Sequence, residues 1–347
     1  MMAEEWPIGA APADSSHAPT RGAARDRLTT VRADFFLSPS ERLTEQERAL
    51  MTAMLHCLVG DIADEIRAAL PSGVAAANDE GNLAIVEALS AARLLNREVL
   101  VRMLLRRADE ERIATAAKAR SGRREARVLQ GLVSHDSGAI SAAAMALILA
   151  RGRRRDRFGQ CLLHFDDLPP EEAIELAQII AAALRNDLNG LHGAGDRDQL
   201  LAAAVDQLLG RYDRANGIEE LSAVLVDLLE DEGQLTDELI VSAAMEGEMT
   251  FVAQALARRC GLRGDVATDE LLSASERRVM ILLRIAGVRR ELAAGLLAGI
   301  GDLLGVTDPG RAIASFDSMS LAEVEDARSW LSADAAYRSA VTRIESR

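Results

Sequence analysis

The placement of proline most constrains the fold of this chain. No proline occurs between Pro71 and Pro169, and none occurs between Pro170 and Pro309. Because proline disrupts helix interiors, and these spans are rich in alanine and leucine, long helices can form throughout them. Aromatic residues make up only 3% of the chain, which argues against a β-sandwich or barrel. The sequence therefore predicts an all-α protein of roughly fourteen to seventeen helices.

The clearest single helix is expected over residues 44–70. Thr44 and Glu47 have the spacing of a capping box, in which each side chain accepts a hydrogen bond from the other residue's backbone amide. Apolar residues then recur at intervals of three and four until Pro71 ends the pattern. We expect this stripe to be buried, and it comprises Met51, Met54, Leu55, Leu58, Ile62, Ile66 and Ala69.

A second helix is expected to begin at Pro169 and Pro170, since proline fits the first helical turn. The acidic pair Glu171 and Glu172 then favours the positive end of the helix dipole. The helix is expected to stop at Asn189–Gly190. Its predicted inward face consists of Ile174, Ala177, Ile180, Ala181 and Leu184.

Three regions are predicted along the chain. Residues 1–29 hold three of the eight prolines without apolar periodicity, and we expect a disordered tail there. Residues 30–190 are expected to form a helical-repeat domain and residues 191–347 a C-terminal helical domain, divided at a glycine-rich turn. The longest apolar stretch, residues 292–306, is too short to span a membrane and is expected to form a short buried helix. With no secretory signal and three scattered cysteines, the chain is predicted to be cytoplasmic.

Several segments resemble a known family. They are residues 43–70 (LTEQERALMTAMLHCLVGDIADEIRAAL), 90–106, 241–262 and 315–344. These segments are similar to the repeat region of the bacterial domain of unknown function 2336, and the resemblance runs with gaps over residues 30–345. It implies stacked helix pairs in a HEAT-like α-solenoid or superhelical array with a C-terminal helical subdomain. It implies no catalytic residue, and the arginines near residues 140–154 depart from the family's pattern.

The main charge feature is a positive band inside an acidic chain. The net charge is −14, yet residues 97–157 carry fifteen basic and seven acidic residues. The densest stretch, which we call the arginine cluster, contains Arg151, Arg153, Arg154, Arg155 and Arg157. Because Gly152 interrupts an apolar run, we expect the cluster at or beside a turn between helices.

Two interpretations of the arginine cluster stay open. The arginines can pair with the acidic C-terminal half, whose nearest acids are Asp166, Asp167, Glu171 and Glu172. Alternatively, they can bind an external anion or an acidic partner. We favour internal pairing, because five guanidinium groups within seven residues repel one another unless acids or solvent surround them.

No motif for catalysis, a cofactor or a metal is found, so no such residue is predicted. The chain lacks a Walker loop, a His-Glu-x-x-His helix and a Cys-x-x-Cys pair. The best metal-like cluster joins Cys161, His164 and the acids 166–167, with Cys161 and His164 expected on one helix face. Because a second ligand group is missing, the pattern favours a structural role for these residues.

These features favour a non-enzymatic protein-protein interaction scaffold or adaptor built from helical repeats, with an unidentified protein partner. The first alternative is binding of a polyanion or nucleic acid through the arginine-rich band 97–157. Only Phe158 supplies an aromatic ring near the cluster, which disfavours stacking on single-stranded bases. The second alternative is an enzyme whose site is assembled from distant residues and is not visible in the sequence.

Overall fold

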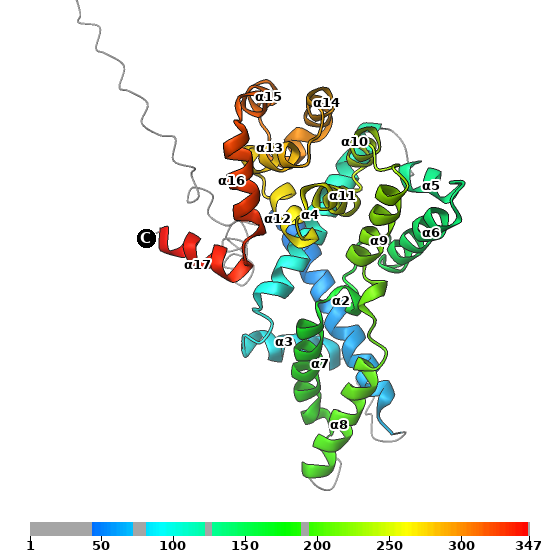
Figure 1. Cartoon of the computed structure of the whole chain (residues 1–347). Helices are drawn as coiled ribbons and strands as arrows, with labels where there is room; N and C mark the ends of the chain where they lie inside the picture. Colours follow the sequence, from blue (N-terminus) through cyan, green and yellow to red (C-terminus); the bar gives the residue numbers. More distant parts are fainter. Residues whose placement is uncertain (1–43, 72–80, 122–126, 189–193, 346–347) are drawn as a thin grey trace, which may run out of the picture.

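The computed structural model describes residues 44–71, 81–121, 127–188 and 194–345, and within these ranges the regular structure is helical (Figure 1). The exception is one isolated antiparallel bridge between Arg155 and Cys161. The all-α prediction is confirmed, and the sixteen described α-helices fall within the predicted number. A HEAT-like solenoid stays a prediction, as does the tail at residues 1–29, which lies outside the described residues.

The helices follow one another along the chain in this order, given in three consecutive parts. The first is α2 (Glu45–Ala69), α3 (Gly81–Ala91), α4 (Glu98–Ser121), α5 (Arg127–Val133) and α6 (Gly138–Arg153). The second is α7 (Pro170–Leu184), α8 (Ala194–Leu209), α9 (Ile218–Asp231), α10 (Asp237–Met245), α11 (Met249–Cys260) and α12 (Gly264–Leu271). The third is α13 (Glu276–Ile285), α14 (Arg290–Ile300), α15 (Pro309–Ser318), α16 (Leu321–Ser332) and α17 (Ala335–Glu345). Short 3₁₀ turns are η1 (Phe165–Asp167), η2 (Arg185–Leu188), η3 (Arg214–Asn216) and η4 (Gly301–Leu304).

Helix α2 forms as its capping box predicts. The Glu47 amide donates to Thr44 Oγ1 at 3.2 Å, and the Thr44 amide donates to Glu47 Oε2 at 3.4 Å. The predicted stripe is buried except for Ala69, which is half-buried. Each fully buried leucine or isoleucine stabilises the fold by about 1.5–3 kcal/mol, so this face anchors the helix.

Helix α7 begins at Pro170 as predicted, but its predicted inward face needs one correction. Ile174 is 43% exposed, whereas Ala173 is fully buried beside Ala177 and Ile180. Adjacent helical positions lie about 100° apart, so Ile174 falls outside the face that Ala173 occupies. The helix ends at Leu184 and continues as η2 to Leu188, while the predicted stop at residues 189–190 lies outside the described residues.

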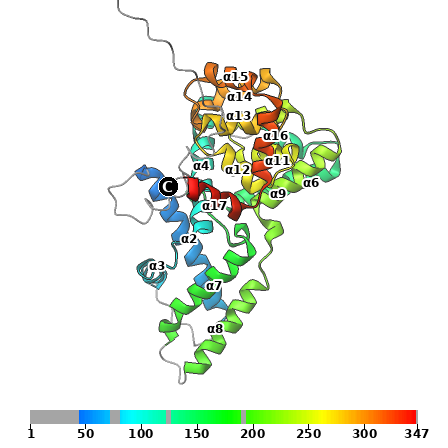
Figure 2. The same cartoon turned by 60° about the vertical axis from the view of Figure 1, so that its left-hand side comes forward.

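Two hydrophobic clusters form the interior. The lower cluster joins α2, α3, α7, α8 and the first half of α4, and the upper cluster joins the second half of α4 with α5, α6 and α9–α16. Figure 2 shows α7 and α8 beside α2, away from α13–α15. Because α8 belongs to the lower cluster, the predicted boundary at residues 190–191 does not coincide with the division between the clusters. Whether either predicted domain folds alone stays a prediction.

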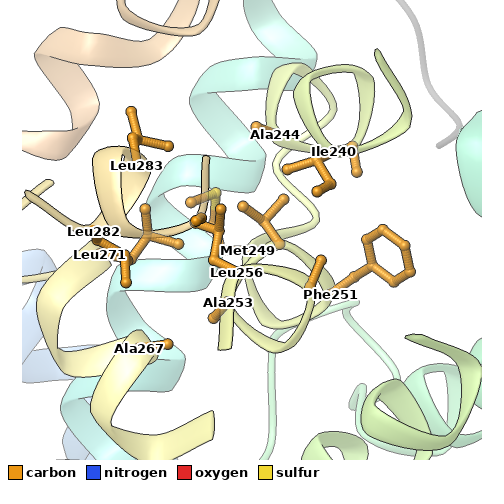
Figure 3. Packing of buried hydrophobic residues seen from close by; sticks show 14 of the residues in the cluster. Ile240, Ala244, Met249, Phe251, Ala253, Leu256, Ala267, Leu271, Leu282 and Leu283 are labelled. Atoms are coloured by element: carbon orange, nitrogen blue, oxygen red, sulfur yellow. The ribbon is translucent and has the colours of Figure 1, made fainter. Parts of the chain in front are cut away.

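Helix α11 lies at the centre of the upper cluster. Ten of its residues are buried, among them Phe251, Ala253 and Leu256 (Figure 3). Small residues on this helix allow close approach of α9 and α12, the two elements it contacts most. Most of α11 is therefore part of the upper cluster, and this burial fixes the place of the loop that precedes it.

The prediction of a short buried helix over residues 292–306 is confirmed only in part. Helix α14 ends at Ile300 and is followed by η4, and Leu296, Leu297 and Ile300 are buried in the upper cluster. Among the described residues, no helix taken singly has the length and apolar composition to cross a membrane. One pair, residues 290–304 with 309–318, meets those two criteria jointly but is bent by 119°.

Candidate functional site: a charged pocket and an exposed helix face

The arginine cluster lies at the end of α6 and in the turn that follows, as predicted. Arg151 and Arg153 are in the last helical turn, and the next three arginines are in a tight reversal. Asp156 stabilises this reversal, because its Oδ1 accepts from the amides of Phe158 and Gln160, both at 2.8 Å. Gly152, which interrupts the apolar run in the sequence, thus predicts the end of α6 to within two residues.

Three arginines of the cluster pair inside the chain. Arg151 contacts Glu248 at the start of α11, and Arg155 binds Glu111 of α4 at 2.9 Å. Arg154 binds Asp167 at 2.8 Å, which is one of the four acids proposed from the sequence. Of the others, Glu172 pairs with Arg97 instead, at 2.6 Å. Two of the three partners, Glu248 and Glu111, therefore are not among the four acids that lie close to the cluster in the sequence.

Asp167 is the buried centre of this pairing. Its carboxylate accepts from Arg154 Nε at 2.9 Å and from the amides of His164 and Ile218 at 3.1 Å. Burial alone would raise the pKa of Asp167, but the charges of Arg107 and Arg154 hold it below its ordinary value. Because Ile218 begins α9, Asp167 ties η1, the end of α6 and the start of α9 to one another.

The other two arginines, Arg153 and Arg157, face solvent. Within the described chain neither has a carboxylate at ion-pair distance. The Arg157 guanidinium lies 4.7 Å from the centroid of the Phe158 ring, which is 75% exposed. The cluster is therefore divided into three arginines with a carboxylate partner and two that have none among the described residues.

A pocket of about 250 Å³ lies between α4, α5, the end of α6 and the start of α11. Its polar lining includes Arg107, Lys118, Arg151, Arg155, Glu110, Glu111, Glu246, Glu248 and Thr250. Glu110 accepts from Arg107 at 2.8 Å and from the Thr250 hydroxyl at 2.7 Å. Burial, together with the neighbouring charges of Arg107 and Arg155, lowers the pKa of Arg151 to about 10, although the charge of Glu110 opposes this shift.

The loop Glu246–Gly247–Glu248 closes one side of the pocket, and sequence reasoning did not identify it. Gly247 has φ +79°, and a Cβ there would lie 2.5 Å from the Ala114 Cα of α4. Only glycine fits this left-handed, close approach. A glycine between two acidic residues is a sequence feature that indicates a turn. Neighbouring residues do not indicate, however, that this turn contacts a helix more than 130 residues earlier in the chain.

The outer face of α6 is apolar and exposed. Met145 is 41% exposed and Leu149 is 54% exposed, while Ala142 lies one turn before them on the same face. The opposite face, with Ile140, Ala144 and Leu147, is buried. No charged residue occurs in α6 before Arg151, so the helix is apolar on all sides although one side faces solvent.

The expected helix through Cys161 and His164 is not formed. Leu162 donates its amide to the Arg154 carbonyl at 2.9 Å, which holds the segment in an extended conformation, and the Asp166 amide donates to His164 Nδ1 at 3.3 Å. The two side chains therefore do not share a helix face. Burial raises the pKa of the Cys161 thiol to about 11. In the part of the chain that the structure describes, no group of three His, Cys, Asp or Glu side chains could hold a metal ion.

One family model matches the chain. It covers residues 117–326, more than half of the length, and is described as an uncharacterised protein conserved in bacteria (DUF2336). This match contains the end of α4, all of α5–α15, and the pocket lining from Lys118 onward. No curated protein matches the chain, and no solved structure matches it.

Proposed function

We propose that this chain, which belongs to the DUF2336 family of uncharacterised bacterial proteins, is a non-enzymatic protein-interaction module that binds its partner through the outer face of α6. The observation that supports this proposal is the exposed apolar stripe Ala142, Met145 and Leu149 on a helix without charges before Arg151. We refer to these three residues as the α6 stripe.

The α6 stripe is unusual for a solvent-facing surface. An exposed helix face normally carries polar side chains, and contiguous exposed apolar surface commonly marks an interaction site. Covering such surface gains roughly 25 cal/mol per Å² of apolar area. The inner face of α6 is already buried against the upper cluster, so the helix needs no rearrangement to present the stripe.

Charge at the end of the stripe indicates the class of partner. Arg153 and Arg157 face solvent beyond Leu149, and the exposed Phe158 ring lies beside Arg157. An amphipathic helix with apolar residues on one face and acidic residues toward one end would cover the stripe and pair with both arginines. We therefore propose an acidic amphipathic segment of another protein as the occupant.

The test begins with a photo-reactive residue at position 149 in the full chain, cross-linked in its native cells. The cross-linked segment is then made as a peptide and its affinity is measured directly. We expect the peptide to be helical and acidic, and we expect Leu149→Asp to reduce its affinity at least about tenfold. Arg153→Gln with Arg157→Gln should weaken binding less and reduce its salt dependence.

Leu83→Asp is the matched control, because Leu83 is 55% exposed on α3, in the lower part of the molecule. The proposal is wrong if Leu149→Asp and Leu83→Asp bind the peptide equally well. It is also wrong if light scattering shows a dimer that only Leu149→Asp dissociates, since the occupant is then a second copy. Binding of duplex DNA or RNA lost on neutralising Arg153 and Arg157 would support the polyanion alternative instead.

A further inference from the structure

The N-terminus of α11 is buried and uncapped at the pocket. Met249 is 2% exposed and Thr250 is 3% exposed, and no side chain caps the helix. Among the described residues, no acceptor is found for the amides of Met249, Thr250 and Phe251. Buried amides without an acceptor are rare because each costs free energy, and at a helix N-terminus they form a site for an anion.

A second observation points to the same place from a different element. Arg107 of α4 lines the pocket with its side chain 3% exposed. Its two terminal nitrogens pair with Glu110 and Glu219, whereas its Nε has no hydrogen-bond partner in the described structure. Arg151 and Arg155 approach from the end of α6, and Lys118 from the last turn of α4. Four cationic side chains from two elements thus line the same pocket as the uncapped end of α11.

The acids of the pocket are already engaged. Glu110 accepts from Arg107 and Thr250, and Glu111 accepts from Arg155. Glu246 accepts from the Val128 amide at 2.8 Å, and Glu248 forms an ion pair with Arg151, although its Oε2 has no hydrogen-bond partner among the described residues. The α11 amides and Arg107 Nε are therefore donors that these carboxylates do not satisfy.

Part of the pocket wall is apolar and indicates the kind of molecule that fits. Leu129, Ile148 and Met249 line the pocket together with the polar groups. A volume of about 250 Å³ exceeds what a bare phosphate fills, leaving room for a small organic group against this wall. We propose that this pocket binds a small phosphate monoester, with the phosphoryl oxygens on the amides of α11 and on Arg107 and Arg151.

The test measures binding to the full chain by calorimetry and by the increase in melting temperature with ligand concentration. The probes are O-phosphoserine, inorganic phosphate, serine and succinate. We expect phosphoserine to bind and to raise the melting temperature progressively, inorganic phosphate to bind more weakly, and serine and succinate not to bind. Amide NMR signals of Met249 and Thr250 should shift on addition of phosphoserine and not of serine.

Arg151→Gln should weaken phosphoserine binding at least about tenfold, because a charge-assisted hydrogen bond is lost. Arg153→Gln, two residues away and facing solvent, is the matched control and should bind normally. If Arg151→Gln fails to fold, Lys118→Gln provides the second variant, with a smaller loss expected. Leu149→Asp should bind phosphoserine normally, so this inference and the proposed function can fail independently.

The inference is overturned if neither phosphoserine nor inorganic phosphate binds at millimolar ligand concentrations, since a dissociation constant of about 1 mM is roughly the weakest specific affinity expected. Equal binding of succinate would also overturn it, because the site would then select carboxylates rather than phosphoryl groups. So would phosphoserine affinity that is the same in the Arg151→Gln and Arg153→Gln proteins.

Discussion

Replacing Asp167 with Asn should destabilise the protein strongly. The carboxylate is 1% exposed and accepts from Arg154 Nε and from two backbone amides. In the variant, the side chain at position 167 keeps one acceptor oxygen but no charge. The Arg154 guanidinium, whose side chain is 5% exposed, then has that oxygen and the carbonyls of Ala150 and Asn216 but no carboxylate. Removing one partner of a buried pair costs about 3–5 kcal/mol, because the other charge stays buried without compensation.

The surface pair of Arg290 and Asp317 gives a matched control. Arg290 Nε donates to Asp317 Oδ1 at 3.1 Å and to Oδ2 at 2.9 Å, which is nearly the Arg154–Asp167 geometry, but both side chains are exposed. Asp317→Asn should therefore cost no more than about 1 kcal/mol. Urea unfolding followed by circular dichroism compares the two variants, provided that each unfolds in one transition.

The dependence on pH gives an independent check. The pKa of Asp167 lies below its ordinary value of 3.8 in the folded protein, so unfolded chains bind this proton more readily. Its stabilising contribution is complete above that value and is lost as the pH falls through the lowered pKa. The difference in stability between wild type and Asp167→Asn should shrink below about pH 4. Equal costs for Asp167→Asn and Asp317→Asn at neutral pH would refute the reasoning.

Three further predictions concern packing, backbone strain and the arginines. Leu58→Ala should cost about 2–5 kcal/mol by lost transfer free energy and a cavity, measured by urea unfolding, and a cost below half a kcal/mol would contradict its packing. Gly247→Ala should cost more than Gly233→Ala in the same assay: both have positive φ, worth about 1–2 kcal/mol, but only position 247 places a Cβ against α4. Arg153→Gln should change the melting temperature little, because exposed groups contribute within about 0.5 kcal/mol; a large decrease would show an unrecognised contact.

The structural features that could be predicted from the sequence are those that depend only on residues close together in the chain. The capping box at Thr44, the proline start of α7 and the end of α6 near Gly152 each follow from groups within one helical turn. The buried stripe of α2 follows equally, because helical periodicity alone determines which residues share a face. These features needed no knowledge of what each helix packs against.

The features that failed or were missed depend on tertiary contacts. Ile174 was expected inside, but α7 buries the neighbouring Ala173. The segment from Cys161 to His164 was expected to be helical, but its backbone pairs with Arg154. Glu248 could not be identified as the partner of Arg151, because the two are almost a hundred residues apart and meet only when α6 and α11 both pack on α9.

The way the two hydrophobic clusters alternate along the chain has a consequence for synthesis on the ribosome. Residues of the lower cluster occur before 109 and again at 163–208, and residues of the upper cluster occur at 113–147 and again from 218 onward. The first helices to emerge must therefore wait for α7 and α8 to complete their interior. By then α5 and α6 have left the ribosome, but α9 and α11, against which they pack, have not. The apolar faces of α5 and α6 therefore stay exposed to non-native contacts until these helices are synthesised. Such interleaving of distant segments slows folding, and we expect nascent chains ending near residue 210 to need chaperone protection.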